Sequence, residues 1–306
     1  MRRRLVRFGL VLPNYARWFD ADGAREAAQT AEQLGYHGLY VNDHVALPRE
    51  EAPLYGNAFL DPFIALGFLA AVTQRVRLGT TVIVVPYRNP LVQAKMVASL
   101  DVLSRGRITL GVGSGHVPGE SEALGVPYAE RGAMTDEYLQ VMRALWTSDE
   151  ASFHGRWFTF ENIRPLTRPL QSPLPVWIGG RGPRVFRRVV RLGQGWHPTA
   201  LEPEQLAEQV AKLRALAGAM GRSEPIAIAP RWALHLVTRS EEAGVTRDPG
   251  EIQRQRYTPA QAAALVARYT ADGVEELVLD LPGGRGAFLQ QVEWFAREVM
   301  PAARPA

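Results

Sequence analysis

The sequence predicts an α/β fold in which about eight strand–helix units close into a (β/α)8 barrel, a single domain over residues 1–306. Strand-like and helix-like segments alternate from one end of the 306-residue chain to the other. Hydrophobic residues make up 46% of it, which is enough to bury a large core. A doubly wound open sheet is the alternative arrangement of the same units.

Short apolar runs predict the strands. They lie at 6–12, 37–42, 76–85, 107–112, 174–179, 194–197, 226–237 and 275–281, and the sixth is the least well defined. Between them, apolar residues recur at helical spacing. These segments predict helices at 24–34, 62–71, 91–103, 134–145, 184–192, 204–217, 260–269 and 287–299.

Two insertions depart from this repeat. Residues 148–172, with FHGRWFTF inside, predict a short hairpin followed by a proline-punctuated stretch. Residues 239–257 are polar and follow the seventh strand, which a barrel places on its catalytic face. A mobile lid and plain disorder are the two interpretations of this second insertion.

Composition excludes several classes of protein. The absence of cysteine excludes disulfides, thiolate metal sites and a Cys nucleophile, and it favours the cytoplasm. No apolar run approaches the roughly 18 residues of a membrane span, so we expect no membrane contact. The net charge of +4 comes from arginines scattered among 31 acids, and Lys95 and Lys212 are the only lysines. We therefore expect no nucleic-acid partner and a small-molecule substrate.

The carboxyl ends of barrel strands carry active sites, and several polar residues fall there. They include Asn14, Tyr15, Asp43, His44, Thr81, His116, His197, His235 and Asp280. No H-x-H pair occurs, so we expect no metal site. GVGSGHVPG resembles a nucleophile elbow and a dinucleotide fingerprint, but it lacks the strand–turn–helix context of either. We interpret Gly113, Ser114 and Gly115 as a close approach of the backbone to a flat ligand, toward which His116 reaches.

WIGGRGPRVFRRVVRLG predicts an anion site. A strand ends at Gly179, glycines free the turn, and Pro183 suits a first helical position. Backbone N–H groups at such a helix start hold anions. Helical spacing places four arginines on one face, namely Arg184, Arg187, Arg188 and Arg191. An ordinary amphipathic helix with a solvated basic face is the alternative.

Taken together, the motifs resemble those of the bacterial luciferase-like flavin and deazaflavin oxidoreductases. They are GLVLPN, GLYVNDHV, RVRLGTTVIVVPYRNPLVQAK, SRGRITLGVGSG, EALGVPYAERG, FHGRWFTF and LPVWIGGRGP, in this order along nearly the whole chain. The Asp-His pair after the second strand and GVGSG after the fourth are similar to the branch that uses the deazaflavin coenzyme F420. The resemblance implies a barrel that binds a tricyclic ring at its mouth, and a homodimer.

The resemblance also implies roles for individual residues. A non-proline cis peptide beneath the ring maps onto Thr81–Val82. Asp43 would hydrogen-bond the ring system, and His44 would exchange the proton that accompanies hydride transfer. A structural Asx-turn with a solvent-facing His44 is the alternative. The remaining cofactor contacts would come from Ser114, Gly115, His116, Gly179, Gly180, Arg181, Gly182, Arg184 and Arg188. Coenzyme F420, with its phosphodiester and oligoglutamate tail, suits several arginines better than FMN, which has one phosphate.

The expected substrate is organic and apolar or aromatic. Sugar-phosphate dehydrogenases of the family have Glu where this chain has His116, and lysines are few, so a sugar phosphate is not expected. The candidate pocket walls are Asn14, Tyr15, Trp18, Trp196, His197 and Trp232, although each aromatic residue is also compatible with core packing. Two other functions stay open: an FMN-dependent monooxygenase that uses O2, and a flavin-binding protein without catalysis.

Overall fold

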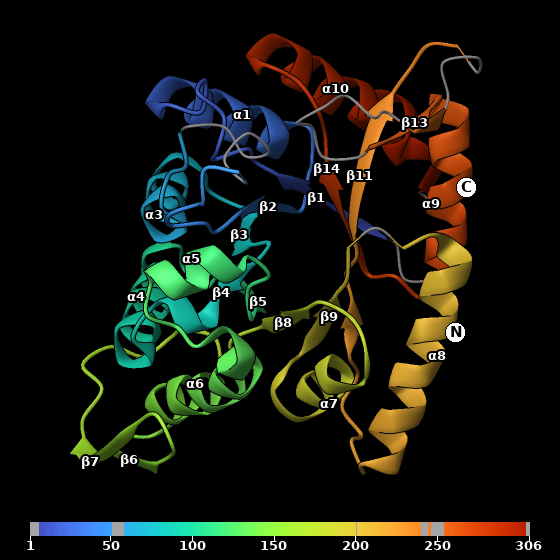
Figure 1. Cartoon of the computed structure of the whole chain (residues 1–306). Coiled ribbons are helices and arrows are strands. Elements are labelled where there is room, and N and C mark those ends of the chain that lie inside the picture. Colours follow the sequence, from blue (N-terminus) through green and yellow to red (C-terminus); the bar gives the residue numbers. More distant parts are fainter. Residues whose placement is uncertain (1–5, 51–57, 200, 240–243, 246–253, 304–306) are drawn as a thin grey trace.

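A ring of parallel strands forms the centre of the molecule, and helices lie around its outside (Figure 1). The computed structural model describes residues 6–50, 58–199, 201–239, 244–245 and 254–303. In that part of the chain, no helix is both long and apolar enough to cross a membrane.

The strands of the ring occupy the eight predicted positions. They are β1 (Arg7–Val11), β2 (Gly38–Val41), β3 (Arg77–Thr80), β4 (Ile83–Val84), β5 (Ile108–Gly113), β8 (Val176–Gly179), β9 (Gly195–His197), β10 (Ala227–Ile228), β11 (Arg231–Leu236) and β14 (Glu276–Asp280). The third predicted strand is divided into β3 and β4 at Thr81–Val82. The seventh is divided into β10 and β11 at Pro230, which has no N–H to donate.

The strands close into a barrel. Neighbours follow the order β10-β9-β8-β5-β3-β2-β1-β14-β11, and the chain runs from β10 directly into β11. A parallel bridge between Thr199 and Arg231 joins the β9 side to β11 at this point. The fold class is therefore the predicted (β/α)8 barrel, and the open-sheet alternative is wrong. Because the strands are parallel, their carboxyl ends meet at one mouth.

Helices connect the strands and cover their outer faces. They are α1 (Ala21–Gln33), α3 (Pro62–Val72), α4 (Pro90–Leu103), α5 (Pro118–Ala123), α6 (Arg131–Thr147), α7 (Pro183–Leu192), α8 (Pro203–Ala219), α9 (Pro259–Ala271) and α10 (Arg285–Glu298), with 3-10 turns at Val85–Tyr87, Tyr128–Glu130 and Met300–Ala303. Many begin at a proline, whose missing N–H costs nothing there. The eight predicted helices are present, whereas the short α5 was not predicted.

The two insertions differ in outcome. The predicted hairpin is confirmed as β6 (Ala151–His154) paired antiparallel with β7 (Thr159–Ile163). In the second insertion, β12 (Gly244–Val245) pairs with β13 (Gln255–Tyr257), and β13 continues the sheet beside β11. Plain disorder throughout 239–257 is therefore wrong, because β12 and β13 are paired strands within it. The rest of the lid hypothesis falls on 240–243 and 246–253, outside the described residues.

Aromatic side chains fill the interior of the barrel. The rings of Tyr40 and Trp177 stack with their centroids 5.7 Å apart, and both are buried. Glycine at positions 9 and 79 makes this possible, because a Cβ would lie 2.6 Å (Gly9) or 2.7 Å (Gly79) from the Tyr40 ring. The Tyr40 hydroxyl donates to the buried carboxylate of Glu276 at 2.8 Å. The barrel is thus a packed core below its mouth.

Candidate active site

His44 follows β2 at the mouth, where a buried carboxylate holds its ring. Nδ1 of His44 lies 2.8 Å from Oε2 of Glu120, a residue of α5 with no exposed surface. Oε1 of Glu120 accepts the backbone N–H groups of Val45 at 2.6 Å and Ala46 at 3.2 Å. The Tyr87 hydroxyl donates to Oε2 at 3.1 Å. One carboxylate therefore fixes both His44 and the loop that carries it.

The charge of Glu120 decides which nitrogen of His44 carries hydrogen. Burial alone would raise the pKa of Glu120. The hydrogen bonds and charge of His44, with the N–H groups of Val45 and Ala46, outweigh burial and lower that pKa below its usual value. An ionised carboxylate only accepts hydrogen bonds, so Nδ1 is the donor in the pair. Nε2 is then the nitrogen that can take up a proton.

Aromatic rings surround His44. The ring of Phe59 lies edge-on at 5.4 Å between centroids, and the ring of His116 lies edge-on at 5.9 Å. Tyr15 also packs against Phe59, with ring centroids 5.7 Å apart. The structure thus brings three predicted site residues, His44, His116 and Tyr15, to one part of the mouth.

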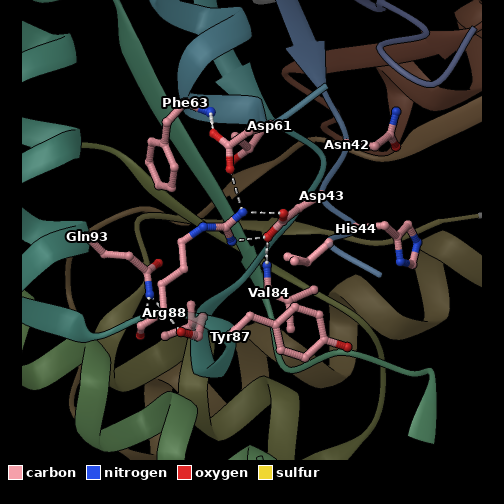
Figure 2. A network of polar contacts seen from close by, with 12 residues as sticks. Asn42, Asp43, His44, Asp61, Phe63, Val84, Tyr87, Arg88 and Gln93 are labelled. Atoms are coloured by element: carbon pink, nitrogen blue, oxygen red, sulfur yellow. Dashed lines mark hydrogen bonds and ion pairs between the residues drawn. The ribbon is translucent and has the colours of Figure 1, made fainter. Parts of the chain in front are cut away.

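Asp43 makes an ion pair that the sequence did not indicate. Figure 2 shows its carboxylate facing Arg88, while His44 points away from that arginine. Arg88 binds both oxygens of Asp43, at 2.7 and 2.8 Å, and also reaches Asp61 at 2.9 Å. The N–H of Val84 donates to the same carboxylate at 2.9 Å. Burial raises the pKa of Asp43, and Arg88 opposes that rise. The hydrogen bond between Asp43 and a cofactor ring stays a prediction. A ligand would have to share carboxylate oxygens that already accept from Arg88 and Val84.

The peptide bond between Thr81 and Val82 is cis, as the family resemblance implied. Thr81 Oγ1 lies 2.9 Å from Nε2 of the buried His197, and Nδ1 of that histidine bonds the carbonyl of Ala229. Burial lowers the pKa of His197 to about 4, and the nearby Arg231 contributes to this. His197 is therefore a neutral group that supports the mouth from inside the barrel.

The glycines of GVGSG make room for neighbouring side chains. A Cβ at Gly113 would lie 2.8 Å from Cγ2 of Val82, and one at Gly115 would lie 2.9 Å from Cγ1 of Val84. Gly115 also has φ of 82°, a conformation that favours glycine. These glycines were interpreted as a place where the backbone comes close to a flat ligand. The structure shows that the valine side chains already occupy the space next to them. The contact expected between the cofactor and Ser114, which lies between Gly113 and Gly115, stays a prediction.

The arginine face of α7 is smaller than predicted. Gly180 and Gly182 have φ of 95° and 94°, so the predicted glycine turn from Gly179 into α7 is present. Arg188, however, is buried: its Nε lies 2.5 Å from Asp136 and its Nη2 2.7 Å from the carbonyl of Gly132, both on α6. The placement of Arg188 on an exposed face is therefore wrong, because α6 offers it a carboxylate and a carbonyl. The exposed arginines here are Arg181, Arg184, Arg187 and Arg191.

Several predicted pocket residues pack in the core. Trp196 has no exposed surface and meets Phe186 edge-on at 5.2 Å. Trp232 packs between Tyr257 and Tyr269, with centroids 5.6 and 5.7 Å away. These rings have the core role that was the alternative for them. Their contribution to a substrate pocket stays a prediction.

The two remaining candidates lie in the loop after β1. Trp18 packs against Phe288 of α10, with ring centroids 5.3 Å apart. The buried Asn14 donates from Nδ2 to the carbonyls of Asn42 at 3.0 Å and Leu60 at 2.8 Å. Asn14 thus joins the loops that follow β1 and β2, and its place in a substrate pocket stays a prediction.

Arg231 links the floor of the mouth to Asp280 at the end of β14. Its guanidinium bonds Oδ2 of Asp280, Oδ1 of Asn42 at 2.8 Å and the carbonyl of Thr81 at 3.1 Å. Arg254 binds the other oxygen of Asp280 at 2.8 Å. Burial opposes ionisation of Asp280, but the two arginines lower its pKa below the usual value. The Nδ2 group of Asn42 is buried, with no hydrogen-bond acceptor among the described residues.

Comparison with known proteins places this arrangement in a family. The family model described as luciferase-like monooxygenase matches residues 6–276. The chain belongs to this family. Within it, an F420-dependent glucose-6-phosphate dehydrogenase of Intrasporangium calvum is 32% identical over 90% of this chain and 92% of its own length. An uncharacterised protein of Mycobacterium tuberculosis is 34% identical over 72% of this chain and 83% of its own.

Solved structures of other luciferase-like proteins share the fold. An F420-dependent secondary alcohol dehydrogenase, determined with an F420–acetone adduct, superposes with a TM-score of 0.79 at 20% identity and covers 98% of this chain and 100% of its own. A monooxygenase from Streptomyces bottropensis superposes with a TM-score of 0.81 at 21% identity, with the same coverage. This luciferase-like chain is an oxidoreductase by family, and the resemblance inferred from its motifs is confirmed.

Proposed function

We propose that this luciferase-like protein transfers a hydride between coenzyme F420 and an organic substrate, with His44 as the acid–base residue. The observation that carries the proposal is the His44–Glu120 pair at the mouth. A buried, ionised carboxylate that orients an imidazole is what proton transfer at a hydroxyl or carbonyl requires. The relative from Intrasporangium calvum, which is named as F420-dependent, supports this choice of cofactor.

The residues at the mouth fit a flavin-type ring. Such a ring carries carbonyl oxygens and ring nitrogens along one edge, and these need hydrogen-bond donors. Asn42 offers a buried Nδ2 group without an acceptor among the described residues, and the Arg231 guanidinium lies next to it. We infer that Asn42 holds that edge of the ring. The exposed Arg184 and Arg187 would contact the anionic tail near the glycine turn before α7.

When bound, the deazaflavin supplies a ring carbon that exchanges a hydride with the substrate. The chain supplies the proton chemistry. Nε2 of His44 takes the proton from a substrate alcohol, or returns it when a carbonyl is reduced, while Glu120 keeps Nδ1 protonated. The edge-on contacts of Phe59 and His116 with the imidazole restrict its orientation.

Equilibrium binding tests the cofactor. Titration of the protein with oxidised coenzyme F420 and separately with FMN, followed by fluorescence, should give micromolar or tighter binding of F420 alone. Arg184→Ala and Arg187→Ala should weaken the binding of F420. They should leave unchanged the binding of the deazaflavin chromophore that lacks the phosphodiester and oligoglutamate tail (the tail-free chromophore). A preference for FMN would reject the F420 assignment and favour the monooxygenase alternative, for which oxygen consumption is the next assay.

A second experiment separates catalysis from binding. His44→Ala should leave F420 binding within about threefold of the parent and lower turnover by roughly 100-fold or more, since a general acid–base residue contributes about that much. Unchanged turnover of an identified substrate would remove His44 from the mechanism. A protein that binds the cofactor but shows no turnover with any tested alcohol or carbonyl compound would support the non-catalytic alternative.

A further inference from the structure

The end of β11 and the neighbouring β13 form one side of the mouth. Trp232, Leu234 and Leu236 are buried, whereas Arg231, Ala233 and His235 alternate with them and are partly exposed. Successive strand residues face opposite ways, so this second set shares one face. Arg231 shows that it is the mouth face, because its guanidinium reaches the carbonyl of Thr81. Figure 1 shows β13 beside the end of β11.

Register places more arginine on the same face. His235 of β11 pairs with Arg256 of β13, so the two side chains share a face. Arg254, just before β13, binds Asp280 at 2.8 Å. We call Arg231, Arg254, Arg256 and Asp280 the basic wall. It contains three guanidinium groups and one carboxylate, an excess of two positive charges. Nε of Arg256 is buried and has no acceptor in the part of the chain that the structure describes.

The basic wall continues into the site around His44. Burial raises the pKa of Tyr15 to about 12, and Asp280 contributes, so the phenol beside the wall stays protonated and can donate a hydrogen bond. The Tyr15 ring contacts Phe59, and Phe59 contacts His44. A molecule that reacts at His44 therefore lies against apolar rings on one side and within reach of donors on the other.

We propose that the basic wall binds an anionic group of the substrate, a carboxylate or a phosphate, while Phe59 and Tyr15 contact its apolar body. Guanidinium groups match the planar, two-oxygen geometry of a carboxylate and of one phosphate edge. The one carboxylate of the wall, Asp280, holds Arg231 and Arg254 in place and leaves the charge excess for a ligand. This inference rests on the proposed function and narrows its substrate to organic anions with an apolar or aromatic part.

Matched probes test the charge requirement without a cofactor or a known substrate. Isothermal titration of the purified protein with benzoate, phenyl phosphate and benzamide at low salt should give at least tenfold tighter binding of the two anions. Arg256→Ala should remove most of that preference and leave benzamide binding unchanged. Arg256→Gln provides a second variant that keeps side-chain size. Arg25→Ala, which removes an exposed arginine of α1, is the control and should keep the preference.

Two results would overturn the proposal. One is equal affinity for benzoate and benzamide in the parent protein. The other is loss of coenzyme F420 affinity in Arg256→Ala, with benzoate binding and binding of the tail-free chromophore both unchanged, because the wall would then serve the cofactor tail. These results are separate from failure of the proposed function. That failure would appear as an absence of F420 binding while the preference for benzoate persists.

Discussion

The carboxylate of Glu120, which has no exposed surface, lies 2.8 Å from Nδ1 of His44. The two residues are 76 positions apart in the sequence, and they meet because Glu120 of α5 binds the loop after β2 at His44, Val45 and Ala46. An ionised partner at Nδ1 fixes the tautomer of the imidazole. Glu120 is therefore a positioning residue in the proposed chemistry.

Glu120→Gln should lower kcat by about 10- to 100-fold, because the amide no longer stabilises charge on the imidazole. KM should stay near the parent value, because Glu120 acts through His44 and does not contact the substrate in the proposed arrangement. Steady-state kinetics measure both constants. Glu120→Asp keeps the charge and should restore part of kcat. An equal fall in kcat in both variants, with a matching loss in the free energy of unfolding, would limit Glu120 to a purely structural role.

Arg88→Ala should lower the free energy of unfolding by about 3–5 kcal/mol. Removal of the arginine leaves the carboxylate of Asp43, which is 3% exposed, without its counter-charge. Arg25→Ala breaks the exposed pair with Asp22 and should cost less than about 1 kcal/mol. Urea denaturation of both variants makes the comparison. Equal losses would mean that the buried pair contributes no more than the exposed one.

Gly113→Ala should lower the free energy of unfolding by about 1–3 kcal/mol, because the new methyl group would lie 2.8 Å from Cγ2 of Val82. Val82→Ala in the same chain should recover part of that loss, which a double-mutant cycle measures. Gly286→Ala on α10, where the added carbon meets nothing within 4 Å, is the control and should be neutral or slightly stabilising. No recovery in the double variant would show that Val82 is not the obstacle.

The sequence predicted the barrel well because its signals are local. Buried strands such as β2 and β5 are continuous apolar runs, and the helices between them have regular apolar spacing. Helix α5 has neither signal. It has six residues, PGESEA, and its buried members are Glu120 and Ser121, so no apolar period marks it. The residue that orients His44 was missed for that reason.

The positions of the arginines show the second limit of sequence reasoning. Arg184 and Arg188 lie one turn apart on α7, and each is followed by valine or phenylalanine within two residues. Nevertheless, Arg184 is exposed, whereas Arg188 bonds Asp136. The difference comes from α6, which packs against α7, and no pattern within α7 contains it. Arg88 and Arg231 are similar cases, since their carboxylate partners lie 45 and 49 positions away. Pairing across elements had to come from the structure.

His197 makes the stability of the protein sensitive to mild acid. Burial lowers its native pKa to about 4, whereas an unfolded histidine titrates near 6.5. Between these values the unfolded chain binds a proton that the native protein does not. The contribution of His197 to the free energy of unfolding is therefore fully present above about pH 7 and is lost as the pH is lowered toward 4, roughly 3 kcal/mol over the whole window.

His197→Gln isolates this contribution, because a glutamine can keep bonds to the Ala229 carbonyl and to Thr81 Oγ1 but cannot titrate. Other groups also change charge between pH 7.5 and 5, so the informative quantity is the difference between parent and variant at each pH. That difference should shrink by about 2 kcal/mol on going from pH 7.5 to 5 in urea unfolding, since only the parent has a histidine here to protonate on unfolding. A constant difference would mean that the pKa of His197 is the same in the native and unfolded states. At pH 5 the carbonyl of Ala229 would then accept from an imidazolium, and the neutral donor–acceptor pair with Thr81 would have to be revised.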